Sequence, residues 1–309
     1  MKFTVGLQYT NDSFLECILE NKSHIHEVYF AWGDFPNGRS NQLQNAQFAP
    51  WELQARQTEY LRQLHDAGIQ LNLLFNANCY GKDSQSRAFF HKIGQTMDYI
   101  QSNFGLNSVT TTSPLIAKFV KNNFETVAVR ASVNMEIGTE QGMDYLAEYF
   151  DGYYMKRELN RDLEAVARLS KWCGQNGKKL HMLANSGCLN HCSAHNFHDN
   201  LVAHEQEIAQ MDNAYQFGGI CREYLKSESH YKSLIEDTNF VRPEDIEKYE
   251  PYFEAVKLAT RISKSPAMIL RSYIRGKYSG NILELLEPAH NIYPYVIENG
   301  DPLKLVKIQ

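Results

Sequence analysis

The sequence alternates short apolar runs with longer amphipathic segments eight times, and this alternation restricts the fold more than any other feature. The apolar runs have strand length and are rich in β-branched and aromatic residues, whereas the segments between them have the apolar spacing of helices. A chain that alternates strands and helices in this way forms a parallel sheet. The expected strands are 3–9, 27–31, 69–81, 107–112, 126–133, 152–156, 178–184 and 253–259.

Local signals place helices between these strands. Ser113-Pro114 has the pattern of an N-cap followed by a proline at the first helical position, and Gly68 stands where a helix is expected to end. The expected helices are 12–20, 51–67, 84–103, one that starts at Pro114, 140–150, 160–174, 204–215 and 266–275.

Eight strand–helix units in roughly 280 residues match a (β/α)8 barrel, whose usual length is about 250 residues. We therefore predict an α/β protein whose single domain, residues 1–286, is a TIM-like (β/α)8 barrel, with a short C-terminal tail, 287–309, packed on it. A doubly wound open sheet is the alternative. It would need a glycine-rich phosphate turn after the first strand, where this chain has Gln8-Tyr9-Thr10-Asn11.

Composition excludes several classes of protein. Aromatic residues make up 12% of the 309 residues, which is too many for a disordered chain, and the net charge of −5 argues against a dedicated nucleic-acid binder. The N-terminal apolar run is too short for a signal peptide, and no run reaches the ~18 apolar residues of a membrane span. We expect a cytoplasmic protein without membrane contact, whose six cysteines are reduced thiols or metal ligands.

The densest group of metal-ligand side chains follows the seventh expected strand, in residues 183–204. We call this segment the Cys/His stretch. It holds Cys188 and Cys192, and its four histidines are His191, His195, His198 and His204. Functional side chains of a barrel gather at the C-terminal ends of its strands. By this rule Cys17 and Cys173, within helices, lie at the opposite end, and the cysteines at the mouth are Cys79, Cys188, Cys192 and Cys221.

Four thiolates at one site fit a [4Fe–4S] cluster, and they also fit a structural Zn²⁺. The nearby histidines suit zinc, and His195 and His198 are spaced to lie on one face of a helix. A zinc site of the HExxH type is excluded, because no second histidine follows His204-Glu205 at the required spacing. Two other interpretations stay open: a cysteine such as Cys79 can be a small buried apolar side chain, and the histidines can be hydrogen-bonding supports.

Two arginines are candidates for binding an anionic small-molecule co-substrate. Arg130 lies within the fifth expected strand, where a buried charge needs a partner such as Glu136 or an anionic ligand. Arg161 follows the sixth strand and can pair with a substrate carboxylate at the mouth. The structural alternative for this second segment is that Asn160 caps the next helix and Asp162 favours its dipole.

A basic run near the C-terminus is a local exception to the acidic composition. No acidic residue interrupts it, and its basic members are Lys257, Arg261, Lys264, Arg271, Arg275 and Lys277. Such a run can bind RNA, a phosphate or an acidic partner, or it can be the solvated face of a helix.

Several segments, in family order over most of the chain, resemble the peptidase U32 family, also called collagenase-like proteases. The most distinctive is RPED within NFVRPEDIEKYE at 239–250. The others are LNLLFNANCYG at 71–81, LNRDLEAV at 159–166, the Cys/His stretch, KLATR at 257–261 and GKYSGNILELL at 276–286. One departure is Ser193, where family members often have a proline after the second cysteine.

The resemblance implies a TIM-type barrel. It also implies, for several members, oxygen-independent hydroxylation of a ubiquinone precursor or of tRNA and rRNA bases, with a [4Fe–4S] cluster on four cysteines. Carried over residue by residue, the ligands are Cys79, Cys188, Cys192 and Cys221, the same set that the strand ends indicate. Short members of the family pair with a sister U32-type protein, so such a partner is expected here.

We therefore expect an iron–sulfur hydroxylase that acts on a small aromatic or nucleobase substrate, or a subunit of one. Its catalytic candidates are Arg130, Arg161 and His195. One alternative is a zinc-dependent peptidase, although the chain has no recognisable motif of a nucleophile and its base. The other alternative is a non-catalytic partner that carries a cluster within a larger complex.

Overall fold

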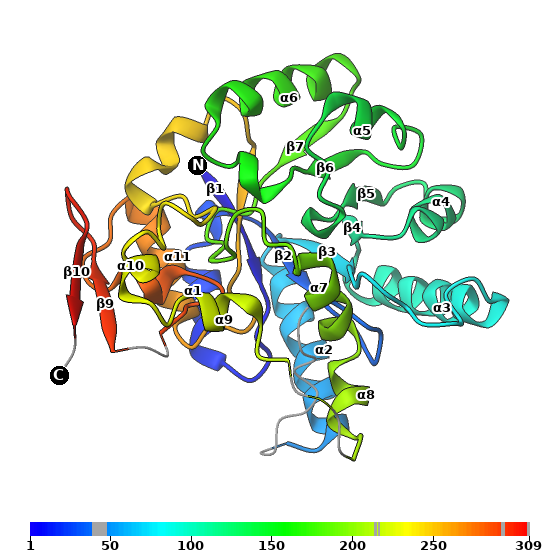
Figure 1. The fold of residues 1–309 in the computed structure, drawn as a ribbon. Helices are drawn as coiled ribbons and strands as arrows, with labels where there is room; N and C mark the ends of the chain where they lie inside the picture. Colours follow the sequence, from blue (N-terminus) through cyan, green and yellow to red (C-terminus); the bar gives the residue numbers. More distant parts are fainter. Residues whose placement is uncertain (39–47, 213–214, 216, 292–293, 308–309) are drawn as a thin grey trace.

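The computed structural model describes residues 1–38, 48–212, 215, 217–291 and 294–307. Eight parallel strands alternate with helices and form one sheet in the order β7-β6-β5-β4-β3-β2-β1-β8 (Figure 1). Each strand overlaps an expected one. The strands are β1 (Lys2–Gly6), β2 (Ile25–Phe30), β3 (Gln70–Phe75), β4 (Ser108–Thr111), β5 (Ala128–Ala131), β6 (Gly152–Tyr154), β7 (Lys179–His181) and β8 (Ala255–Leu258).

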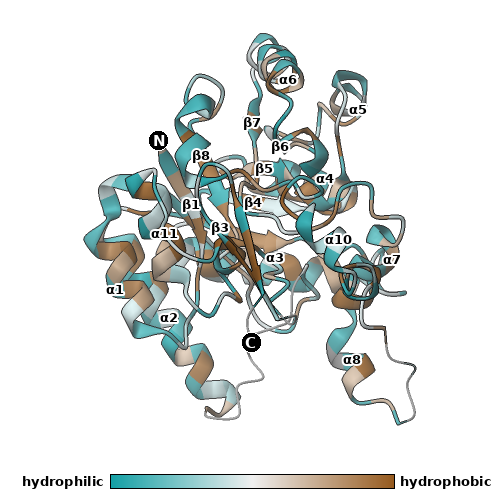
Figure 2. Cartoon of the chain, turned by 60° about the vertical axis from the view of Figure 1, so that its left-hand side comes forward, coloured by the Kyte–Doolittle hydropathy of each residue, from teal (hydrophilic) through white to brown (hydrophobic). Residues whose placement is uncertain are grey.

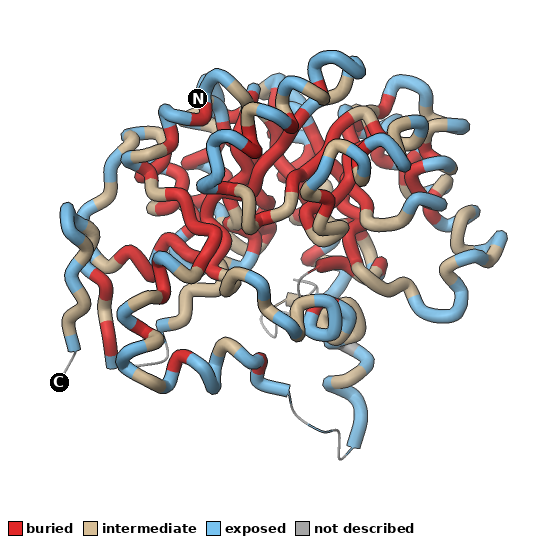
Figure 3. The backbone as a smooth tube through the Cα atoms, turned by 45° about the horizontal axis from the view of Figure 1, so that its top comes forward, coloured by how far each residue is buried: buried red, intermediate tan, exposed pale blue. Residues whose placement is uncertain are grey.

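The sheet closes on itself between β7 and β8. Beyond β7 the chain bridges β8 at Leu183 and Lys257, where the Lys257 amide donates to the Met182 carbonyl and the Ala184 amide donates to the Lys257 carbonyl, both at 3.0 Å. On its other side β8 pairs in parallel with β1. The predicted TIM-like (β/α)8 barrel is therefore confirmed, and the open sheet is excluded. Figure 3 shows the buried residues concentrated in the middle of the molecule.

The longer helices bury one face against the outside of the barrel (Figures 1 and 2). In α3 the buried residues Ile93, Met97, Ile100 and Phe104 recur every three or four positions, as in an amphipathic helix. The α-helices are α1 (Asp12–Glu20), α2 (Pro50–Asp66), α3 (Arg87–Phe104), α4 (Pro114–Asn123), α5 (Glu140–Asp144), α6 (Leu163–Gln175), α7 (His195–Ala203), α8 (Glu205–Ala209), α9 (Ile220–Tyr224), α10 (Glu228–Lys232) and α11 (Pro266–Arg275). The 3-10 helices are η1 (Lys22–His24), η2 (Val133–Met135), η3 (Arg157–Leu159), η4 (Pro243–Tyr249) and η5 (Ile282–Leu285). No helix within the described ranges is long and apolar enough to cross a membrane.

Two local expectations are wrong. In place of one helix over 204–215, of which 213 and 214 lie outside the described residues, α7 and α8 meet at His204, and α7 starts inside the Cys/His stretch. The sequence of α7 is rich in histidine, asparagine and aspartate, which have weak helix propensity, so propensity did not indicate a helix there. The cap of α6 is Asp162, which accepts a hydrogen bond from the Ala165 amide at 3.0 Å, and not Asn160.

The C-terminal tail forms an antiparallel hairpin of β9 (Tyr295–Glu298) and β10 (Lys304–Lys307) at one side of the barrel (Figure 1). Tyr295 and Ile297 are buried and join the hydrophobic core, so the hairpin is packed on the domain. The segment just before it runs beside the Cys/His stretch, where Ser186 and Glu287 form a parallel bridge.

Candidate functional site

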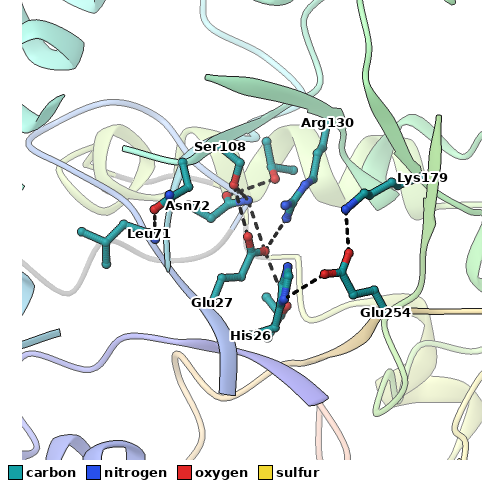
Figure 4. Close-up of polar contacts among 11 residues, drawn as sticks. His26, Glu27, Leu71, Asn72, Ser108, Arg130, Lys179 and Glu254 are labelled. Atoms are coloured by element: carbon teal, nitrogen blue, oxygen red, sulfur yellow. Dashed lines mark hydrogen bonds and ion pairs between the residues drawn. The ribbon is translucent and has the colours of Figure 1, made fainter. Parts of the chain in front are cut away.

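Glu27 of β2 is the centre of a polar network inside the barrel (Figure 4). Its buried carboxylate forms an ion pair with Arg130 of β5 and accepts hydrogen bonds from Ser108 at 3.2 Å and from Asn72 at 3.4 Å. Alternate residues of each strand face the axis of a barrel, so side chains of non-neighbouring strands can meet there. The partner of Arg130 is thus Glu27, and the expected pairing with Glu136 is wrong.

Lys257 of β8 lies one position before the C-terminal end of its strand. Its ammonium nitrogen is 4.0 Å from the centre of the Tyr29 ring and 4.9 Å from that of Tyr154. The residue is 8% exposed, and its Nζ atom makes no hydrogen bond or ion pair with any residue that the structure describes. Burial, and next the charge of Arg261, lower the pKa of Lys257 to about 7. At neutral pH the side chain is therefore divided between its charged and neutral forms.

A cavity of about 60 Å³ adjoins Lys257 at the mouth of the barrel. Two further cationic side chains line it: Arg157 of η3, which follows β6, and Arg261, which follows β8. Both are buried, with 4% and 7% of their surface exposed. Much of the remaining wall is aliphatic, and these residues are Leu74, Val133, Leu183, Ala259 and Ile262. The cavity thus combines three basic side chains and the carboxylate of Glu287 with a partly aliphatic wall.

Arg157 connects this cavity to the Cys/His stretch. Its Nη1 atom is 2.7 Å from Nε2 of His195, the first residue of α7, and its Nη2 atom donates to Asn134 at 2.6 Å. The Nδ1 atom of His195 is 2.8 Å from Glu136, and Nε2 is 3.2 Å from Asp199. Because a guanidinium only donates, Nε2 acts as the acceptor, and Nδ1 carries the proton that is donated to Glu136. The structure places His195 at the mouth with its ring orientation fixed, and its catalytic role stays a prediction.

The loop that carries the two cysteines of the Cys/His stretch is fixed by two distant segments. The Gly187 amide donates to the Glu287 carbonyl at 2.9 Å, and the Cys188 carbonyl accepts from Asn239 at 3.0 Å. A Cβ atom at Gly187 would lie 2.2 Å from the carbonyl oxygen of Pro288. Because real Cβ atoms do not approach backbone oxygens so closely, the loop depends on a glycine at this position.

Cys221 of α9 lies near Cys188 and Cys192. Burial raises the pKa of Cys221, and the neighbouring thiols of Cys188 and Cys192 raise it further. All three side chains are partly buried, and none is in a disulfide. Three of the four predicted ligands, from two separate segments of the chain, thus lie near one another.

Cys79, the fourth predicted ligand, lies beyond β3 and contacts the other end of α7. A hydrogen bond with His204 lowers the pKa of Cys79, and so does the amide of Gly81, whose nitrogen is 3.4 Å from the sulfur. His204 directly follows α7, whereas Cys192 lies before its first residue. The nine residues of this helix span about 13 Å, which separates the two positions. In this conformation Cys79 is therefore paired with His204 and not with the other three thiols.

The donor set was tested for its fit to a metal or a cluster. Thiolates are the usual protein ligands of iron–sulfur clusters and of structural zinc, so the chemistry of Cys188, Cys192 and Cys221 fits either group. The side chains as placed do not form a finished site. Among the residues described, no group of three or more His, Cys, Asp and Glu side chains is close enough to hold a metal ion. The set of four ligands therefore stays a prediction.

The remaining predicted residues have structural contacts. Cys17 of α1 and Cys173 of α6 are buried in the hydrophobic core, as expected for residues outside the site. Arg161 donates to the carbonyl of Glu236 at 2.7 Å and to that of Thr238, so it holds the segment that precedes Phe240. Its role in anion binding stays a prediction. Two residues of the basic run, Lys257 and Arg261, are buried at the mouth, so the run is not one continuous surface.

No protein-family model matches the sequence. The uncharacterized protease MJ1657 of Methanocaldococcus jannaschii is 23% identical over 289 residues, which cover 90% of this chain and 80% of that protein. Among solved structures, the U32 peptidase Mk0906 matches with a TM-score of 0.60 at 14% identity, over 84% of this chain and 92% of that one. The chain is a relative of the U32 peptidases. The resemblance to the U32 family that the sequence indicated is confirmed by these two similarities together.

Some residues of this U32-type mouth were missed in the sequence. Arg157 was not singled out, and Lys257 and Arg261 were assigned to a surface run. The signal that could have identified Lys257 is its position in β8. Side chains along a strand alternate between its two faces, so Ala255 and Lys257 share one face, and in a barrel one of the two faces points to the axis. No local signal could have paired Glu136 with His195, since 59 positions separate them (195 − 136).

Proposed function

We propose that this U32-type barrel is an iron–sulfur protein that carries out an oxygen-independent hydroxylation of a small aromatic or nucleobase substrate, or serves as a subunit for it. One observation carries the proposal: the thiols of Cys188 and Cys192 lie near enough to Cys221 to raise its pKa. The active sites of such folds lie at the mouth of the barrel, beyond the strand ends. A grouping of three free thiols from two segments would be unusual for cysteines that only fill space.

The position of Cys79 divides the proposal into two forms. With three thiolates, a cluster has one iron without a cysteine ligand, which suits direct binding of a substrate. With Cys79 as a fourth ligand, the cluster suits electron transfer or a structural role. The second form requires Cys79 to leave His204 and move toward the other end of α7, whereas the first form keeps the described conformation.

The chain's own residues have defined tasks in this proposal. Cys188, Cys192 and Cys221 would hold the cluster, which when bound supplies electron transfer or Lewis acidity. Arg157 orients the His195 ring through Nε2, and Glu136 accepts a hydrogen bond from Nδ1. His195 can therefore hold or pass on a proton at the mouth, and the aliphatic wall of the cavity limits the access of water.

Anaerobic reconstitution with iron and sulfide tests the proposal. We expect the wild type to bind both, with absorption near 400 nm, and we expect Cys188→Ser, Cys192→Ser and Cys221→Ser to lose most of the iron. Cys173→Ser is the matched control, because Cys173 is buried far from the mouth and should leave the iron content unchanged. Full iron retention in all three mouth variants would refute the proposal. Cys79→Ser separates the two forms, since only the four-cysteine form predicts a loss.

Peptide hydrolysis is the second candidate, because the two relatives are named as a protease and a peptidase. The donors that would hold zinc are the same thiols together with the histidines of the Cys/His stretch. Release of fragments from a casein digest by zinc-loaded protein, abolished in Cys188→Ser, would favour this candidate over the hydroxylase.

A further inference from the structure

A groove of about 690 Å³ lies between α7, α8 and the segment that leads into α9. We call it the α7–α9 groove, and its α8 side projects from the barrel (Figure 1). Its walls include Leu201 and Val202 of α7, Ile208 of α8 and Phe217 before α9. Small-molecule sites in proteins have volumes of roughly 300 to 1,000 Å³ and mostly apolar walls. The α7–α9 groove therefore has the size and the lining of a ligand site.

Apolar side chains are concentrated on the surface around this groove. Of the twelve large apolar side chains that are exposed among the described residues, six lie between Phe197 and Tyr224. Two of these six, Phe197 and Phe217, are in ring contact at 5.2 Å, so the group is not scattered. Single exposed apolar side chains are common in folded proteins, whereas a contiguous group of them marks a binding surface. A ligand that enters the groove would remove part of this surface from water.

The side chains in the groove indicate an aromatic ligand. The Phe217 ring lies edge-on to Phe197 and also to His198, at 5.7 Å between ring centres, and both Phe217 and His198 line the groove. Met211 adds a thioether sulfur, which makes favourable contacts with rings. A flat ring can lie against Leu201 and at the same time contact the aromatic wall. An aliphatic chain would gain the burial but not the ring contacts.

The charges around the groove indicate that this ring is uncharged. One acidic and one basic side chain line the groove, Glu205 and Arg222, so their charges cancel. Glu207 of α8 and Asp212 beyond it are exposed and add negative charge nearby. Negative charge at this surface would repel the phosphate groups of RNA. The groove therefore suits a free aromatic molecule better than a nucleobase within RNA.

We propose that the α7–α9 groove binds the uncharged aromatic ring of the substrate, with the ring between Phe217 and Leu201. Both segments that carry the grouped thiols border the groove: α7 starts three residues after Cys192 (195 − 192), and Arg222 follows Cys221. The role of the ring as a substrate rests on the proposed function. Binding of the ring does not, because the groove is lined by side chains other than the cysteines.

The experiment measures the binding of 2-naphthol, an uncharged aromatic compound, to the full chain before reconstitution with iron, by the change in naphthol fluorescence. We expect saturable binding at one site, and we expect indole, a second uncharged ring, to displace the naphthol. 2-Naphthoate has the same rings and one negative charge, and it should displace at least about tenfold less effectively. Adenosine monophosphate represents the nucleobase alternative. Displacement by it as effective as that by indole would overturn the assignment to an uncharged ring.

Two variants of the groove test its location. Leu201→Glu places a charge in the apolar wall, and we expect 2-naphthol to bind at least about tenfold more weakly. Phe217→Leu keeps the wall apolar but removes the ring, and we expect binding to be about threefold to tenfold weaker. Leu115→Glu is the matched control, because Leu115 is an exposed residue of α4, and it should bind as the wild type does.

Two results would overturn the proposal: no saturable binding by the wild type, or unchanged affinity in both Leu201→Glu and Phe217→Leu. Thermal unfolding of each variant shows whether it is folded, so that lost binding is scored only in folded protein. Since iron is absent from these titrations, their failure leaves the iron–sulfur proposal standing. Conversely, a protein that binds no iron but binds 2-naphthol in the groove would refute the proposed function alone.

Discussion

The barrel interior and the Cys/His stretch both carry functional groups, but they are held in different ways. Glu27, Arg130 and Lys257 stand on strands, and each position is fixed by the alternation of the sheet. Cys188, Cys192 and Cys221 stand on a loop and a short helix, and their positions depend on contacts such as that of Gly187 with Glu287. The comparison teaches that the strand register alone positions the interior site, whereas the cysteine site also needs contacts between segments outside the strands.

The largest effect is expected from breaking the interior network. Glu27→Gln removes the charge that compensates Arg130 in a buried site, and we expect a loss of about 3 to 5 kcal/mol in the free energy of unfolding. Urea denaturation measures this loss. Glu254→Gln is the control, because Glu254 forms an exposed pair with Lys179 and should cost less than about 1 kcal/mol. Equal losses in the two variants would show that the buried ion pair stabilises the barrel no more than an exposed one does.

A second effect concerns the pH dependence of stability. The pKa of Lys257 is about 7 in the folded chain and 10.5 when unperturbed, so between these values the unfolded chain binds more protons. The free energy of unfolding of the wild type therefore rises with pH across this range, and Lys257→Met lacks that rise. We expect the free energy of unfolding of Lys257→Met, minus that of the wild type, to be about 2 to 3 kcal/mol smaller at pH 9 than at pH 6. A difference that is independent of pH would contradict the lowered pKa.

A smaller effect is expected from disturbing the support of the cysteine loop. Gly187→Ala places a methyl group against the Pro288 carbonyl, and we expect a loss of about 1 to 3 kcal/mol together with lower iron binding after reconstitution. Gly174→Ala is the matched control, since a Cβ atom in that part of α6 meets no other atom within 4 Å. Thermal unfolding and iron analysis of both variants give the comparison. Normal iron binding by Gly187→Ala would mean that the cysteine loop does not need the close approach of Gly187 to Pro288.

The smallest effect separates two interpretations of Arg161. Its hydrogen bonds go to the carbonyls of Glu236 and Thr238, so Arg161→Gln should cost about 1 kcal/mol of stability and leave iron binding after reconstitution unchanged. Urea denaturation and iron analysis give the two measurements. Unchanged stability would contradict the structural role and favour the anion ligand that the sequence first suggested.

The fold could be predicted from the sequence because its strands are short apolar runs with clear helical segments between them. Residues whose roles depend on closure of the barrel could not be predicted. Arg130 meets Glu27 across the axis at a separation of 103 positions, and no local pattern indicates which acid it meets. Lys257 looked like part of a charged surface run, because a buried lysine is rare and its neighbours in sequence are also basic.

The cysteines show the same division within one site. The spacing of Cys188 and Cys192 identified their loop, and the rule of strand ends indicated Cys221 and Cys79 as possible neighbours. Cys79 contacts His204 at the end of α7, a helix that residue propensities did not indicate. The tertiary contacts of the helix include those of His195 with Glu136 and Arg157, and such contacts cannot be derived from helix propensity.

The closure of the cylinder between β7 and β8 has a consequence for how the two sites communicate. Both hydrogen bonds at this joint use the backbone of Lys257, one through its amide and one through its carbonyl. On the other side of the joint the chain continues from Ala184 and reaches Cys188 four residues later. The residue whose ammonium group faces the cavity therefore also anchors, through its backbone, the segment that leads to the cysteine loop.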